Sequence, residues 1–285
     1  MKEFKIITDS CVDFNIDILK SKNLQVVPIN TIIDDVEYGI DREYIDQQKF
    51  FKEMEAGKEP TTVAAKPTDL ERIFKENLDK EIDFIYISFS SALSSSFANA
   101  HTVIDSLKNR YKDFKMYLID SKAATASLDL IVDYALSLQA AGKDIDQVYE
   151  EVKNSIKNLH VEFIIKDLYH LMRGGRLSKT SAVLGTALKI SPILILDDEG
   201  KISLIDKVRG RKRAIDKLLN NFSKSFDSEK FSKVIISHSL AEKDAKLLKE
   251  KLIEKFNVQV DVFDLVITIG AHTGPGTLIL GYFKK

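Results

Sequence analysis

The alternation of short β-branched runs with longer amphipathic segments is the feature that most constrains how this chain can fold. Short runs rich in Ile, Val and aromatic residues predict strands, and apolar residues that recur every three or four positions predict helices. The expected strands are Phe4–Thr8, Gln25–Ile29, Phe84–Ser88, Lys115–Ile119, Val161–Ile165, Ile193–Leu196, Ile202–Val208, Lys233–Ser237 and Gln259–Val266. The expected helices are Thr68–Leu78, Ser96–Arg110, Leu128–Ala141, Ile145–Asn158, Ala214–Phe226 and Ala241–Phe256. This order predicts an α/β fold with largely parallel sheets.

The length of 285 residues allows two domains, each with its own core. We find no internal repeat and no linker rich in Pro, Gly or Ser. We expect the boundary near Leu159–His160, where two long predicted helices end and a new strand begins. The predicted N-terminal α/β domain is therefore residues 1–159, and the predicted C-terminal α/β domain is residues 160–285.

The charge balance and the cysteine content exclude several classes of protein. The 42 Lys and Arg residues against 43 Asp and Glu leave a formal net charge of -1, so no global field attracts nucleic acid or anionic membranes. The single cysteine, Cys11, excludes an intramolecular disulfide and fits a reducing compartment. The N-terminus enters a strand pattern at once, without a signal-peptide hydrophobic region. We expect a soluble, cytoplasmic protein.

An uncharged stretch, Leu265–Phe283, contains one polar pair, His272 and Thr273, between two apolar runs. Its length suggests a membrane span, but the central His-Thr-Gly-Pro-Gly argues against one. Glycines allow positive φ angles and a close approach to a ligand. Two interpretations stay open: a buried β-turn-β unit with a hydrogen-bonded histidine, and an imidazole and a hydroxyl held at the mouth of an apolar site.

Hydroxyl-rich segments follow four of the expected strands, where parallel sheets usually bind their ligands. These segments are Asp9–Asp13, Phe89–Ser96, Asp120–Lys122 and His238–Ser239. Ser88–Ser96 contains six serines in nine residues just before a helix, which favours either an anion cradle or ordinary N-capping. The paired threonines Thr61 and Thr62 can likewise donate to an anion or simply form a turn.

Two arginine-containing motifs also allow two interpretations each. Leu171–Leu177 places two arginines around a diglycine, which suits a carboxylate or phosphate, or else a helix C-terminus with solvated arginines. Lys207–Arg213 is basic but has no interleaved aromatics, which argues against nucleic acid. It predicts a solvated helix start or a docking patch for an acidic partner.

Motifs for metal binding and nucleophilic catalysis are missing from the sequence. The five histidines have no HxxxH or HxH spacing, and no GxSxG, Walker A or GxGxxG motif occurs. We therefore expect no catalytic residues, no metal site and no cofactor. An enzyme acting on a small phosphorylated metabolite remains the alternative, motivated by the Arg-Gly-Gly-Arg turn and the serine-rich helix start.

Taken in order, these segments resemble the DegV family, whose best-understood members are the bacterial fatty-acid-binding proteins called FakB. The resemblance runs along the whole chain through Thr8–Ser10, Pro60–Thr62, Ile87–Ala100, Asp120–Lys122, Leu171–Arg176, Lys189–Pro192, Gly200–Lys201, Lys207–Gly210 and Gly270–Gly276. Two segments depart from the family pattern. The family's Thr-Ser-Gln-Pro-Ser is Thr62–Lys66 here, and its Leu-Ser-Gly-Thr-Tyr is Leu93–Phe97.

The resemblance implies a carrier without chemistry of its own. It implies that one long-chain fatty acid lies in a tunnel between two α/β domains, its carboxylate bound at Thr62, Ser94, Ser95, His272 and Thr273. A separate kinase, engaged through Arg173 and Arg209, would use ATP to convert the carboxylate into an acyl-phosphate for phospholipid synthesis. We expect the carrier to be a monomer.

The energetics of burial are consistent with this function. About fifteen methylenes at about 0.8 kcal/mol each supply roughly 12 kcal/mol before association costs. Hydroxyl and imidazole donors then fix the head group, and no salt bridge is required. Candidate tunnel walls are the apolar segments Ala182–Leu188 and Leu265–Ile269.

Overall fold

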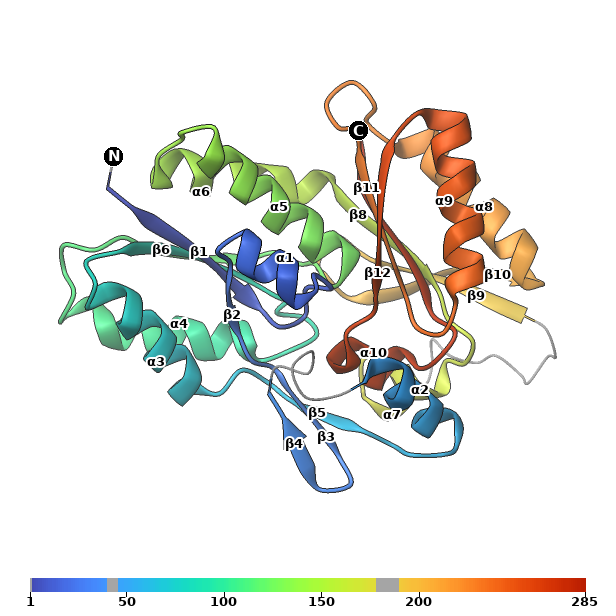
Figure 1. The fold of residues 1–285 in the computed structure, drawn as a ribbon, viewed down its shortest axis with the longest axis horizontal. Helices are drawn as coiled ribbons and strands as arrows, with labels where there is room; N and C mark the ends of the chain where they lie inside the picture. The colour runs from blue at the N-terminus through green and yellow to red at the C-terminus, as the bar shows by residue number, and fades with distance from the viewer. Residues whose placement is uncertain (1, 40–45, 178–189) are drawn as a thin grey trace.

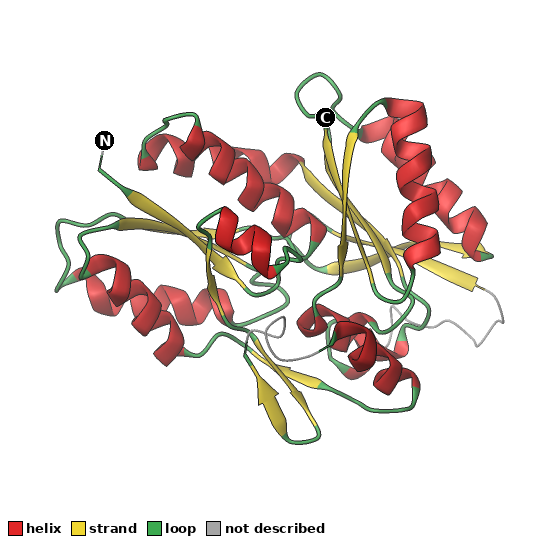
Figure 2. Cartoon of the chain, viewed as in Figure 1, coloured by secondary structure: helices red, strands yellow, loops and turns green. Residues whose placement is uncertain are grey.

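The computed structural model describes residues 2–39, 46–177 and 190–285, and it confirms the α/β class (Figures 1 and 2). Its strands form sheets of four, six and three strands. All nine expected strands and all six expected helices are present, most with ends shifted by one to three residues. The predicted wall segment Ala182–Leu188 lies outside the described residues.

The four-stranded sheet is parallel throughout, as expected. Its order is β2 (Gln25–Val27), β1 (Phe4–Asp9), β6 (Asp83–Ser88) and β7 (Met116–Asp120). Helices α3 (Pro67–Leu78) and α4 (Ser96–Lys108) cover one face, and α5 (Ala126–Ala140) and α6 (Ile145–Ser155) cover the other (Figure 1). Every residue of β6 is buried, as a central strand covered on both faces requires.

The six-stranded sheet is mostly antiparallel, so the prediction of largely parallel sheets is wrong for this part of the chain. Its order is β10 (Ile202–Arg209), β9 (Ile190–Leu196), β8 (Leu159–Ile164), β13 (Leu278–Phe283), β11 (Lys233–His238) and β12 (Gln259–Asp264). Only β11 and β12 are parallel, and a helix, α9 (Glu242–Phe256), connects them. Strands β9 and β10 are joined by a short turn, and β13 enters between β8 and β11 in the opposite direction. Parallel pairing needs a long crossover, so the short turn between β9 and β10 allows only antiparallel pairing of these two strands.

Helix α5 is the layer that the two large sheets share. It contacts β1 of the four-stranded sheet and β8, β11 and β13 of the six-stranded sheet. The helix is buried around most of its circumference, as expected for a helix with core on both sides. Its N-terminus passes so close to β13 that a Cβ on Gly281 would lie 2.8 Å from the Ala126 carbonyl carbon. Helices α8 (Arg211–Ser225) and α9 cover the opposite face of the six-stranded sheet (Figure 1).

A third, small sheet lies beside three short helices. Its order is β4 (Val36–Tyr38), β3 (Asn30–Ile33) and β5 (Thr61–Val63). Helices α2 (Gln47–Glu55), α7 (Tyr169–Arg173) and α10 (Ile267–Thr273) gather next to it, with α10 in contact with β3, β5, α2 and α7 (Figure 1). The remaining described α-helix is α1 (Ile16–Ser21), whose N-cap Asn15 accepts a hydrogen bond from the Ile18 amide, and a 3₁₀ turn, Ile156–Asn158, follows α6.

The uncharged stretch does not form the β-turn-β unit that was one of its two interpretations. Its first apolar run is helix α10, and only the second run is a strand, β13. The helix forms although four of its seven residues are β-branched, because it is almost entirely buried and tertiary packing outweighs propensity. Gly270 is needed for this packing, since a Cβ there would lie 2.3 Å from the Phe51 ring.

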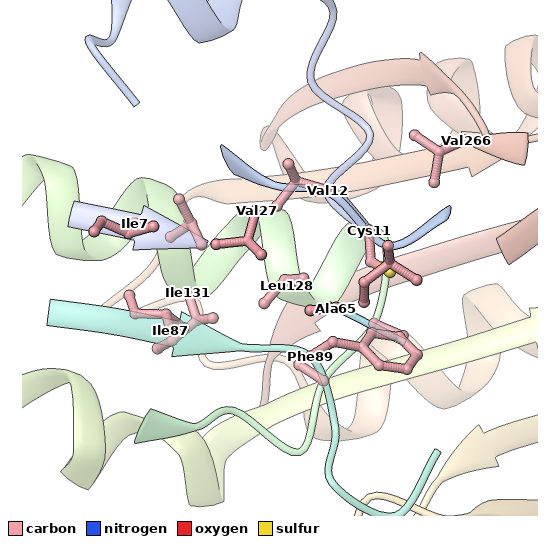
Figure 3. Packing of buried hydrophobic residues seen from close by; sticks show 14 of the residues in the cluster. Ile7, Cys11, Val12, Val27, Ala65, Ile87, Phe89, Leu128, Ile131 and Val266 are labelled. Atoms are coloured by element: carbon pink, nitrogen blue, oxygen red, sulfur yellow. The ribbon is translucent and has the colours of Figure 1, made fainter. Parts of the chain in front are cut away.

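Hydrophobic residues of the four-stranded sheet and of one face of the six-stranded sheet belong to one core that includes α5, and the other face of the six-stranded sheet forms a second core with α8 and α9. Figure 3 shows part of the first core, with Ile7, Ile87 and Leu128 between strands and helix. Among the described residues, no helix is both long and apolar enough to cross a membrane. The boundary predicted near Leu159 stays a prediction; β8, the first strand of the six-stranded sheet, begins at that residue.

Candidate functional site

A mainly apolar cavity, partly open to solvent, lies between the two large sheets. Its walls combine both halves of the chain: β8, β9, β10 and β13 on one side, and the loops after β1, β6 and β7 on the other. The apolar lining residues are Cys11, Ile29, Ala64, Phe89, Leu93, Ala124, Val161, Phe163, Leu171, Leu196, Ile202, Ile269 and Ile279. Two of these residues, Cys11 and Phe89, are labelled in Figure 3. The predicted wall segment Leu265–Ile269 contributes Thr268 and Ile269.

The polar lining residues are fewer: Thr62, Ser94, Thr125, Arg176, Thr268, His272 and Thr273. Thr62 on β5 and His272 on α10 are in direct contact, with 2.7 Å between Thr62 Oγ1 and His272 Nε2. Residues separated by 210 positions in the sequence thus form one polar group in the cavity wall. The family resemblance implied that Thr62 and His272 both contribute to the site, and the structure brings their side chains into contact.

The His272 ring is held in an environment that favours its neutral form. Burial, followed by the nearby charges of Arg176 and Arg173, lowers the pKa of His272 to about 4. Its Nδ1 atom is buried without a hydrogen-bond partner among the described residues. Gly174 lies against this atom so closely that a Cβ would be 2.1 Å from it. A buried N–H without an acceptor is costlier than a lone pair in the same place, so the proton is favoured on Nε2.

The serine-rich segment after β6 has only one hydroxyl at the cavity, that of Ser94. Ser94 Oγ lies 2.9 Å from Ser96 Oγ and accepts a hydrogen bond from the Ser96 amide. Ser95 is exposed, is absent from the cavity wall, and makes no side-chain cap at the start of α4. Ser94 thus occupies the first free amide of α4, which favours the capping interpretation over an anion cradle.

Thr273 lines the cavity, but its hydroxyl donates to the Ile269 carbonyl one turn earlier in α10, at 3.3 Å. Thr268 was not expected at the site; its Oγ1 lies 3.2 Å from Thr31 Oγ1. Thr125 was not expected either, and it has a strained backbone (φ 50°, ψ -130°) at the start of α5. Such strain in a β-branched residue is concentrated at functional positions in proteins.

The three arginines of interest lie in different environments. Arg176 lines the cavity, whereas Arg209 is exposed at the end of the edge strand β10. Arg173 donates from Nη2 to the carbonyls of Pro60 and Ala271, at 2.9 and 3.1 Å, and so ties β5 to α10. Within the described part of the chain, no group of three His, Cys, Asp or Glu side chains could hold a metal ion.

Comparison with known proteins identifies the family of the chain. Residues 3–285 match the profile of the family described as "Uncharacterised protein, DegV family". A DegV domain-containing protein of Clostridium perfringens (strain 13 / Type A) is 32% identical over 281 residues, which cover 98% of this chain and 96% of that protein. The chain belongs to the DegV family.

Solved DegV structures share the fold of this DegV protein. One, described as the fatty acid binding of a DegV family protein from Thermus thermophilus, is 25% identical, covers 99% of each chain and has a TM-score of 0.88. Another is the Streptococcus pneumoniae fatty acid kinase (Fak) B3 protein loaded with linoleic acid, which is 21% identical, covers 99% of this chain and 100% of its own, and has a TM-score of 0.85.

The departures of this DegV protein from the family pattern have structural consequences. Ala64, where the family pattern has glutamine, makes that part of the cavity wall apolar. Ala65 stands where the pattern has proline, and its amide donates to Ser96 Oγ at 3.1 Å. Proline has no N–H and could not make this bond.

Sequence reasoning left Thr125, Thr268 and Arg176 out of the expected binding residues. Thr268 lies in an apolar run that carries no sign of a buried helix. Arg176 lies in a motif whose two interpretations sequence could not separate, and burial in the cavity wall is what distinguishes it from a solvated side chain.

Proposed function

We propose that this DegV protein binds one long-chain fatty acid in the cavity between its two large sheets. The observation that carries the proposal is the distribution of polar and apolar groups in the cavity wall: thirteen lining residues are apolar, and the few polar ones include the Thr62–His272 pair and Ser94. The apolar wall supplies the affinity for the acyl chain, and the polar cluster fixes the carboxylate. The fatty acid binding described for the Thermus thermophilus DegV protein supports the proposal.

The Thr62–His272 contact orients the donor that the carboxylate needs. With its proton on Nε2, neutral His272 donates to Thr62 Oγ1 across the 2.7 Å contact. The hydroxyl hydrogen of Thr62 is then available to donate into the cavity. Ser94 Oγ accepts from the Ser96 amide and can donate its own hydrogen in the same way. Two hydroxyl donors on a carboxylate contribute about 1–3 kcal/mol each.

We further propose that the protein presents the bound carboxylate to a separate kinase, which transfers the γ-phosphoryl group of ATP to it. The name of the Streptococcus pneumoniae protein of the same fold and the family resemblance support this role. The kinase would dock through Arg173 and the exposed Arg209. Arg209→Gln is then expected to keep the bound fatty acid but to slow its phosphorylation by the kinase; equal rates for variant and wild type would remove Arg209 from the docking surface.

Head-group variants test the binding proposal. Thr62→Val and Ser94→Ala are each expected to weaken palmitate binding by about tenfold, because each removes one hydroxyl donor. The matched control is Ser95→Ala, since Ser95 neighbours Ser94 but is exposed outside the cavity wall. Palmitate affinities that are the same in all three variants would contradict the proposed position of the carboxylate.

A further inference from the structure

Arg176 is the only positively charged side chain in the described part of the cavity wall, because the lowered pKa of His272 keeps that ring neutral near pH 7. Its Nε donates to the Leu93 carbonyl at 3.0 Å, and its Nη1 donates to the Gly174 carbonyl. A guanidinium carries five N–H groups, so these two bonds leave three for other acceptors. Within the described residues, Nη2 makes no hydrogen bond.

The charge of Arg176 has no described counter-ion. No Asp or Glu lies among the described lining residues, and burial alone, without any carboxylate, accounts for the shifted pKa of Arg176. Burial lowers the pKa of Arg176, as expected for a cation that has left water without gaining an opposite charge.

The carbonyl contacts explain only part of this arrangement. Through these two bonds Arg176 connects the loop after β6 to the turn after α7. A neutral amide side chain could make similar contacts without the cost of desolvating a positive charge. An anion in the cavity would offset that cost, because a partly buried charge is tolerated when it is paired.

We propose that Arg176 supplies the counter-charge for the head group of the bound lipid. The site would therefore select lipids with an anionic head, such as an ionised carboxylate or acyl-phosphate, over neutral fatty alcohols and esters. Arg176 suits this role better than its neighbours, since Arg173 already donates to two carbonyls and His272 favours its neutral form. The inference rests on the proposed function and names the ligand class within it.

The first test compares two probes of equal chain length, palmitate and hexadecanol. Wild-type protein is expected to prefer palmitate, and Arg176→Gln is expected to lower the ratio of the two affinities at least about tenfold. Arg176→Lys, which keeps the charge without the fork, should retain part of the preference. Wild-type protein that binds both probes equally would overturn the inference without any variant, so a poorly folding variant does not leave it undecided.

The second test follows the carboxyl group itself, using palmitate labelled with ¹³C at that carbon. Bound to wild-type protein, the carboxyl is expected to stay ionised from about pH 8 to about pH 5, because Arg176 lines the cavity and no described acid does. In Arg176→Gln it should take up a proton within that range, giving a measurable ¹³C shift. Identical titrations in both proteins would overturn the role of Arg176 but not the fatty-acid proposal, whereas a wild-type protein that binds neither probe would contradict the proposed function.

Discussion

At the scale of single residues, two buried ionisable groups have pKa values shifted in opposite directions. Burial raises the pKa of Asp9 to about 6, although hydrogen bonds from Tyr86, Phe89 and Ser88 oppose the shift. Burial lowers the pKa of His272 to about 4. Asp9 holds the Phe89 amide, with 2.6 Å between Asp9 Oδ2 and the amide nitrogen, and Phe89 lines the cavity. The protonation of both groups therefore depends on pH, and both hold or form part of the cavity wall.

Asp9→Asn is expected to change how stability depends on pH. The folded pKa of Asp9 lies above its ordinary value of 3.8, so folding takes up a proton and the free energy of unfolding falls as pH rises between about 4 and about 6. The contribution lost across this interval is on the order of 3 kcal/mol, and the asparagine variant lacks it. Urea unfolding at a series of pH values measures the slope. An unchanged slope in the variant would contradict the shifted pKa of Asp9.

His272→Asn is expected to act in the opposite direction. The folded pKa of His272 lies below its ordinary value of 6.5, so its contribution is complete above that pH and is lost as pH falls toward about 4. The loss is on the order of 3 kcal/mol. In the wild type the two slopes partly cancel. The same urea series should give a stability that rises more steeply on acidification in His272→Asn than in the wild type, and a shallower rise would refute the assignment.

At the scale of elements, the turn between β9 and β10 fastens one large sheet to the other. Ser90 Oγ donates to the Gly200 carbonyl at 2.9 Å, and Lys122 Nζ donates to the Asp198 carbonyl at 2.7 Å. The strands on either side of this turn bring Leu196 and Ile202 into the cavity wall. The turn thus closes the part of the cavity that these two side chains line.

Gly200→Ala is expected to loosen this closure. Gly200 has φ +78°, and a Cβ there would lie 2.3 Å from Ser90 Oγ and 3.0 Å from the Lys122 Cα. We expect a loss of about 1–3 kcal/mol in the free energy of unfolding, together with faster loss of bound palmitate. Gly57→Ala is the matched control, because Gly57 also has positive φ but no atom within 4 Å of the added Cβ. Equal palmitate release rates in both variants would show that the turn does not close the cavity.

The elements differ in how well the sequence predicted them. Helices with a clear apolar face, such as α9, were predicted within one residue at each end, because their periodicity reflects the packing itself. The three-residue strands β4 and β5 were not predicted, since so short a run carries no period. Helix α10 was not predicted because its burial on all sides removes the polar face that marks an amphipathic helix.

The candidate site likewise depends partly on local sequence patterns and partly on contacts between residues far apart in the chain. The sequence alone singled out His272 and Thr62 by their surroundings in the chain, and the family resemblance joined them to one ligand. Their contact depends on how β5 meets α10, which no local pattern contains. The cavity position of Arg176 and the exposure of Ser95 depend on the same tertiary packing.

At the scale of the whole molecule, the cavity lies inside a core that both large sheets share. Helix α5 contacts both sheets, and the lining residues come from both. A ligand that fills the cavity therefore adds apolar contacts between the two halves of the chain, and it stabilises the folded state by mass action. The topology produces this arrangement, because α5 packs against β1 of one sheet and against β8, β11 and β13 of the other.

The most direct test of this account is to identify what the purified protein carries. Native mass spectrometry gives the mass of the intact protein, and denaturing organic extraction followed by mass spectrometry identifies any lipid released from it. We predict one long-chain fatty acid per chain, lost from the native species on extraction. An empty protein that also fails to load with added fatty acids of several lengths would contradict the central claim that the cavity is a fatty-acid site.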